Sequence, residues 1–182
     1  TIVGVLAGVP PALWLAGWQQ KRQELRDEKR LEIGLLNKEI EILELIEREI
    51  EYNRETLRSI EHVESDLVEY DARPLLRSSF KDELWRALSD GESVRYIRNL
   101  QLLDSIGKTY HLIRELKYLD DKMLFIYCIS RSSQDELNTL FGEIESQVIN
   151  SSYPLFDTTS ALLGELGAEL CTLRKRRESI AE

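Results

Sequence analysis

The first 18 residues of this chain, from Thr1 to Trp18, contain no charged side chain, and the 12 residues that follow are dense with charge. The hydrocarbon core of a bilayer is about 30 Å thick, and roughly 20 apolar residues in a helix cross it. The segment is slightly shorter than that, but the chain begins with Thr1 and not with Met, and a few residues ahead of it would complete the span. We therefore predict a transmembrane helix over residues 1–18.

Two other interpretations of this segment are the apolar core of a cleaved signal peptide and a buried helix of a soluble domain. A signal peptide carries a basic stretch before its apolar core, and the sequence shows none. A buried helix of a soluble domain usually includes some polar residues. The absence of a basic stretch and, apart from Thr1, of polar residues therefore favours the transmembrane helix over both alternatives.

Aromatic and basic residues mark one end of the predicted span. Trp14 and Trp18 lie where aromatic rings favour the membrane–water interface, and Lys21 and Arg22 follow them. Basic residues accumulate on the cytoplasmic side of membrane proteins. We therefore expect a single pass through the cell membrane, with the rest of the chain cytoplasmic.

Small residues recur at every fourth position of the span, at Gly4, Gly8, Ala12 and Ala16. Such a face lets two membrane helices approach closely, although Gly and Ala are common in all membrane helices. Pro10 and Pro11 each remove a backbone hydrogen bond, so we expect a kink near Gly8.

Residues 19–69 are predicted to form one long amphipathic helix that continues from the span. This stretch contains no Pro and one Gly, and it is rich in good helix formers. An apolar stripe repeats every seven residues, at Leu36, Leu43, Ile50 and Leu57. This repeat is typical of a helix that packs along another, either in the same chain or in a second copy. We expect the acidic run to form the solvated face: Glu39, Glu41, Glu44, Glu47, Glu49 and Glu51.

Residues 70–182 are predicted to form a helical bundle that packs on the long helix. Apolar periodicity indicates a short helix that begins near Ser79 and stops at Gly91, then a helix over about 93–130. Two more follow, over about 133–150 and from 157 onward, with a loop at Pro154 between them. No stretch alternates as a strand would. The fold class is therefore all-α: a transmembrane helix, a long amphipathic helix and a cytoplasmic bundle.

The middle of the chain carries the pattern W-x-x-L…G…I…L-L…Y-x-x-I, formed by Trp85, Leu88, Gly91, Ile97, Leu102, Leu103, Ile106, Tyr110, Ile113 and Leu116. Here the sequence resembles small uncharacterised prokaryotic membrane proteins with one N-terminal span and a cytoplasmic helical domain. Those proteins often have Asn near the end of the pattern, where this chain has Lys117 and Tyr118. The resemblance implies the same topology and no activity.

No motif in the sequence predicts catalysis, a cofactor or a metal, because Walker, G-x-S-x-G and G-x-G-x-x-G signatures are absent. We expect His62 and His111 to be surface or edge residues. Cys128 and Cys171 are isolated and are expected to be reduced and buried. The net charge of −9 argues against nucleic-acid binding.

One basic cluster stands near the C-terminus: Arg174, Lys175, Arg176 and Arg177. Cations at the end of a helix complement its dipole. The same cluster could instead contact anionic lipid head groups, or bind a phosphate-bearing ligand in an oligomer.

The sequence therefore predicts a membrane-anchored, self-associating helical scaffold or interaction protein on the cytoplasmic face, without catalysis. Its expected partners are membrane lipids, further copies of itself and another membrane protein. The alternative is an oligomeric ion channel or ligand-gated effector, whose pore several N-terminal helices would form because one span cannot enclose a pore.

Overall fold

The computed structural model describes residues 2–66, 80–130 and 135–182; within these, the side chains of residues 2–13, 59–66, 123, 124, 126–130, 135–138 and 141 are not described. Four α-helices and a short 3-10 turn make up these parts of the chain: α1 (Ile2–Asp66), α2 (Glu83–Asp90), η2 (Ser93–Tyr96), α3 (Leu100–Ser130) and α4 (Asp135–Ala181). No strand occurs in them. The predicted all-α fold class is confirmed.

Helix α1 is continuous over 65 residues, which at 1.5 Å per residue gives a length of about 97 Å. It joins the charge-free N-terminal segment to the predicted long helix without a break. Among the described residues, no helix is both long enough and apolar enough to cross a bilayer. Most of the predicted span lies outside the described side chains, including Gly4, Gly8, Pro10, Pro11 and Ala12.

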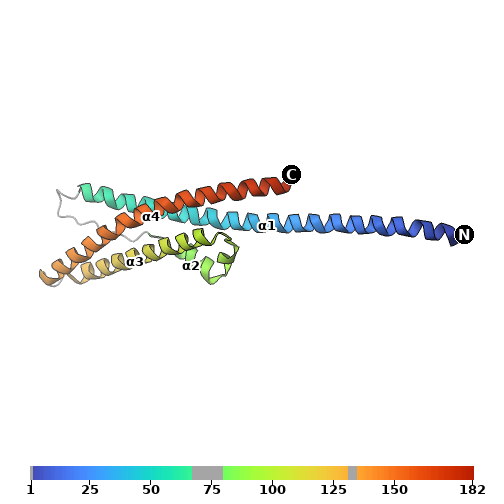
Figure 1. Ribbon diagram of the computed structural model, residues 1–182. Coiled ribbons are helices and arrows are strands. Elements are labelled where there is room, and N and C mark those ends of the chain that lie inside the picture. The colour runs from blue at the N-terminus through green and yellow to red at the C-terminus, as the bar shows by residue number, and fades with distance from the viewer. Residues whose placement is uncertain (1, 67–79, 131–134) are drawn as a thin grey trace.

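The other helices cover only the C-terminal part of α1 (Figure 1). Helix α4 runs antiparallel to α1 and packs along it, and α3 packs along α4 on the other side. Helix α2 and η2 contact α1 as well. The N-terminal part of α1 extends past the end of α4, and the C-terminus lies beside the middle of α1 (Figure 1).

The seven-residue stripe of α1 forms the centre of this bundle. Leu36, Leu43, Ile50 and Leu57 are all 0–1% exposed with only this chain present. On α4 the buried residues continue the pattern: Val148, Leu155, Leu162, Leu166, Leu170 and Leu173. The stripe therefore packs within the chain, on its own antiparallel neighbour.

The predicted loop at Pro154 is wrong, because α4 runs through it from Asp135 to Ala181. Pro154 is exposed, while Val148 and Leu155 on either side are buried. The buried face thus continues past the proline, and its packing outweighs the lost backbone hydrogen bond. The Thr158 hydroxyl donates to the Pro154 carbonyl at 2.7 Å.

The predicted single helix over 93–130 is also wrong at its start. The 3-10 turn Ser93–Tyr96 comes first, Ile97 is extended, and α3 begins at Leu100. Asn99 caps α3, because its side-chain oxygen accepts from the Leu102 N–H at 3.1 Å. The expected stop at Gly91 is confirmed, since α2 ends at Asp90. A Cβ at Gly91 would lie 2.9 Å from the Ala87 carbonyl oxygen, so only glycine fits the turn without displacement.

Because the stripe is intramolecular core, Leu43→Ala should destabilise the bundle by about 3 kcal/mol, the usual cost of a large cavity. The control is Leu31→Ala in the same helix, where the side chain is 66% exposed and the cost should be small. Both costs are measured by denaturation of the full chain in detergent. Trp14 and Trp18 are replaced by Phe, so that the fluorescence of Trp85 alone reports unfolding. Equal midpoints for the two variants would contradict the packing.

Candidate functional site

Three polar side chains of α1 bind the segment that crosses it between residues 80 and 99. The Asn53 amide pairs with the backbone of Lys81, donating to its carbonyl and accepting from its N–H, both at 2.8 Å. Glu39 accepts from the Arg98 N–H at 2.7 Å. Backbone groups removed from water need such partners, so these residues fix where the segment lies.

A third side chain, Glu49, supplies the N-terminal cap that α2 lacks. Asp82 stands at the N-cap position of α2 but makes no side-chain capping bond. The Glu49 carboxylate of α1 instead accepts from the Leu84 N–H at 3.3 Å. A carboxylate is stabilising at this end of a helix, so Glu49 orients α2 against α1.

The expectation that the acidic run is wholly solvated is therefore wrong. Glu41 and Glu51 are exposed, but Glu39 is 0% exposed and Glu49 is partly buried. A signal was present in the sequence. Glu39 and Asn53 each follow a stripe residue by three positions, which is where a second core position of a seven-residue repeat falls.

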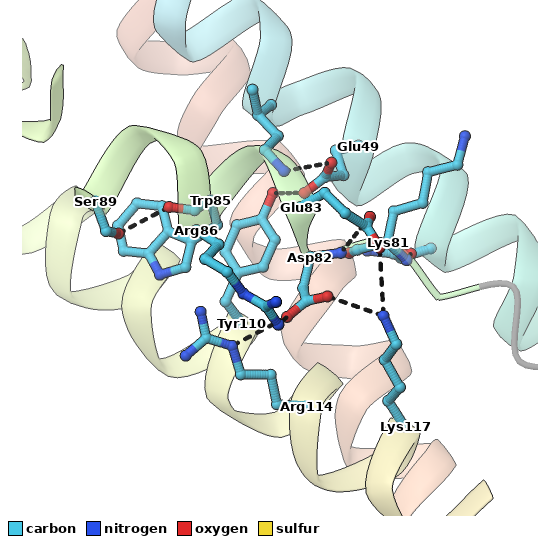
Figure 2. A network of polar contacts seen from close by, with 12 residues as sticks. Glu49, Lys81, Asp82, Glu83, Trp85, Arg86, Ser89, Tyr110, Arg114 and Lys117 are labelled. Atoms are coloured by element: carbon cyan, nitrogen blue, oxygen red, sulfur yellow. Dashed lines mark hydrogen bonds and ion pairs between the residues drawn. The ribbon is translucent and has the colours of Figure 1, made fainter. Parts of the chain in front are cut away.

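Asp82 collects cations from two helices at the junction of α1, α2 and α3 (Figure 2). Its side chain is 1% exposed, with Lys117 at 3.0 Å, Arg86 at 3.0 Å and Arg114 at 3.2 Å. Burial by itself raises the pKa of this carboxyl, but the hydrogen bond and charge of Lys117, with the two arginines, outweigh it. The pKa of Asp82 therefore lies below its usual value, and Asp82 is a carboxylate at neutral pH.

Tyr110 links this junction to the core. Its ring stacks on Trp85 with centroids 5.2 Å apart, and its hydroxyl donates to Glu49 at 2.8 Å (Figure 2). Burial and the adjacent Glu49 raise the pKa of Tyr110, so it stays a hydrogen-bond donor. Burial also raises the pKa of Glu49, which the bonds from Tyr110 and Leu84 only partly offset.

The residues of the recognised pattern are mostly core residues of this junction. Those buried are Leu88, Ile97, Leu102, Ile106, Tyr110, Ile113 and Leu116. Lys117, the residue after this pattern, pairs with Asp82, and that hydrogen bond raises the pKa of Lys117. The ion pairs of Asp82 join α2 to α3, and the hydrogen bonds of Glu49 join both to α1, so the junction holds three helices together.

Among the described residues no group of three or more His, Cys, Asp or Glu side chains could hold a metal. His111 is exposed and lies 3.4 Å from Glu115, while His62 lies outside the described side chains. The expectation that Cys171 is buried is wrong, because it is a free, exposed thiol. Cys128 lies outside the described side chains.

The basic cluster of α4 reaches across to α1. Arg174 pairs with Glu44 at 2.8 Å, Arg176 pairs with Glu32 at 2.6 Å, and Arg177 donates to the Asn37 side chain at 3.4 Å. Lys175 is exposed. About half of the Arg174 and Arg176 side chains remains exposed, so these contacts are surface ties between the two helices.

The part of α1 beyond these ties is a lone helix. Every residue from 14 to 31, which we call the stalk, is exposed, including Ala16, Trp14 at 71% and Trp18 at 47%. Lys21 and Arg22 follow Trp18, and the Arg22 guanidinium lies 3.9 Å from the centre of the Trp18 ring. Two of the residues predicted to mark a membrane interface, Trp18 and Arg22, thus lie in contact on the stalk.

No family model matches this sequence, and comparisons with curated proteins and with solved structures give no match.

Asp82→Asn should destabilise the bundle at pH 7 by about 2 kcal/mol, since hydrogen bonds to charged groups are lost. The lowered pKa of Asp82 stabilises the fold above the unfolded value of about 3.9. This contribution is lost as the pH falls through the folded value. The difference between wild type and variant should therefore shrink below about pH 4. Urea denaturation at pH 7 and pH 3 checks it, and an unchanged difference would contradict the ion pairs.

Glu49→Gln should behave in the opposite way. Its raised pKa means that the fold disfavours the charged form, so the wild type gains stability as the pH falls from 7 toward the unfolded value of about 4.3. The two carboxylate oxygens of Glu49 accept separately from Leu84 and Tyr110, and the amide of glutamine has only one acceptor oxygen. One bond is therefore lost at every pH, and urea denaturation should find that the variant falls further below the wild type as the pH is lowered from 7 to about 4.3. The exposed Glu41→Gln is the control. A stability difference between the wild type and the Glu49→Gln chain that stays constant over this pH range would contradict the raised pKa of Glu49.

Proposed function

We propose that this chain is a membrane-anchored helical scaffold, with residues 1–18 in the membrane and the bundle on the cytoplasmic side. The observation that carries the proposal is the course of α1. One helix leads from the charge-free segment, through an exposed stalk, into the core of the bundle. A helix shared by anchor and bundle transmits position without a flexible linker.

The stalk sets the distance between the two parts. From Trp18, the last residue of the charge-free segment, to Glu32, which pairs with Arg176 of α4, the chain advances 14 residues. At 1.5 Å per residue this is about 21 Å. The bundle would thus stand about 20 Å from the membrane surface, enough to leave room for a partner between them.

The contact between Arg22 and Trp18 supports the anchoring. An indole ring favours the interface between hydrocarbon and water, and an arginine beside it can place its charged head among the lipid head groups. The proposed lipid contact of the stalk rests on Trp14, Trp18, Lys21 and Arg22. Arg174 and Arg176 of α4 have carboxylates of α1 as partners, and Arg177 has the Asn37 amide. Contact of this cluster with lipid or phosphate stays a prediction.

Self-association is part of the proposal, but the seven-residue stripe is not its surface. Leu36, Leu43, Ile50 and Leu57 are covered by the chain's own helices. A second copy would therefore bind elsewhere on α1. The alternative of a pore formed by several N-terminal helices stays a prediction from the sequence, because its residues lie largely outside the described side chains.

The anchoring predicts where the three tryptophans of the chain lie relative to a bilayer. A chain with Trp14→Phe and Trp85→Phe, reconstituted in vesicles, should show strong quenching of Trp18 by brominated lipids. The matched control keeps Trp85 alone, which stacks on Tyr110 in the bundle, and it should not be quenched. Equal quenching of the two single-tryptophan chains, or none of either, would overturn the proposed arrangement.

A further inference from the structure

The stalk carries its charges on two opposite faces. With 3.6 residues per turn, successive residues are rotated by about 100°. Arg22, Arg26, Lys29 and Arg30 then fall within an arc of about 100°. The acidic residues fall on the other side of the helix, within an arc of similar width, at Glu24, Asp27 and Glu28. Lys21 lies at the edge of this acidic side. We call these two surfaces the basic face and the acidic face.

Neither face is covered by the chain itself. All of these side chains are exposed. The contact between the bundle and α1 begins only at Glu32, which pairs with Arg176 of α4. Among the ion pairs of the described residues, one joins the two faces, between Arg30 and Asp27 at 3.9 Å, and both side chains are largely exposed. The separation of charge along the stalk thus remains almost unneutralised within the chain.

A lone polar helix of this kind needs external support. Isolated helices are marginal in water, and most of their stability in proteins comes from packing against a neighbour. The stalk also exposes apolar side chains along its length, with Leu25 55% exposed and Leu31 66% exposed. A neighbour that covers the stalk has to offer a negative surface to one face and a positive surface to the other.

We propose that this neighbour is a second copy of the chain, whose acidic face lies against the basic face of the first. This inference rests on the proposed membrane anchor, because anchored copies hold their stalks parallel and at the same height. The heights then match. Arg22 lies two residues from Glu24, and Arg26 lies one from Asp27 and two from Glu28. At 1.5 Å per residue, these offsets are within about 3 Å along the axis.

The contact uses different surfaces on the two copies, so it is heterologous. Each pair still has one free face of each sign, and further copies can add until a ring closes or a row forms. Like faces would repel, which excludes a symmetric pair through the same face.

Anionic lipid fits the stalk less well than a second copy does. From Arg22 to Arg30 the basic face extends about 12 Å along the helix, away from the proposed membrane surface. Its far end at Arg30 is therefore beyond the reach of the lipid head groups. The acidic face beside it would be repelled by the same lipids. A second copy satisfies both faces at once.

Two charge-reversed full-length chains test the pairing. The first carries Arg22→Glu, Arg26→Glu and Arg30→Glu, which makes both faces acidic. The second carries Glu24→Lys, Asp27→Lys and Glu28→Lys, which makes both faces basic. Energy transfer between donor- and acceptor-labelled chains in neutral phosphatidylcholine vesicles reports association. Each variant alone should associate roughly tenfold more weakly than the wild type, since several exposed ion pairs are lost.

Mixing the two variants should restore association, because an acidic stalk then meets a basic one. The matched control is Arg22→Lys, Arg26→Lys and Arg30→Lys, which keeps both faces and should associate as the wild type does. Rising salt should weaken the wild-type contact, since exposed charges are screened. Undiminished association of either reversed variant alone, or no recovery in the mixture, would overturn the proposal.

Flotation of the wild-type chain with the vesicles separates the two levels of the inference. A chain that does not float lacks the anchor, and the proposed function and the aligned stalks both fail. A chain that floats but does not associate overturns the stalk contact alone. Association that requires phosphatidylserine, and is lost only in the first variant, would assign the basic face to lipid and also overturn the contact between copies.

Discussion

The bundle depends on how α1 satisfies the backbone that crosses it. Between residues 80 and 99 the chain contains one short helix and a 3-10 turn, so many of its N–H groups have no partner within a helix. Asn53, Glu49 and Glu39 accept from three of them, the N–H groups of Lys81, Leu84 and Arg98. A buried backbone group left without one costs about 1–3 kcal/mol. These three side chains therefore determine where α2 begins and how α3 is placed.

The charges at the junction follow from that placement. Once α2 is fixed on α1, Asp82 is buried beside α3 and needs the cations that Lys117 and Arg114 provide. Tyr110 then lies between Trp85 and Glu49 and joins the aromatic core to the polar bonds. A closed network of this kind holds three helices in one arrangement. It makes this part of the bundle a rigid body.

The same packing separates α1 into two functional parts. The C-terminal part of α1 makes its contacts within the chain: α4 covers the apolar stripe, and Arg174 and Arg176 of α4 pair with Glu44 and Glu32. Its N-terminal part keeps all side chains exposed over residues 14–31. Under the proposed function the first part carries the bundle, and the second part meets the membrane and further copies of the chain. A continuous helix couples the two.

The sequence alone determined the all-α class, the long helix and most core positions, because apolar residues at helical spacing must be buried together whatever the neighbour is. It did not determine which neighbour covers the stripe at Leu43 and Ile50, since a seven-residue repeat fits a second copy as well as α4. Only the tertiary structure decided that α4 continues through Pro154 and that Glu39 points inward. In both cases a contact distant in sequence outweighs the local preference. The packing of α4 against α1 keeps the chain helical through Pro154. The Arg98 N–H needs an acceptor, and this turns the Glu39 carboxylate inward.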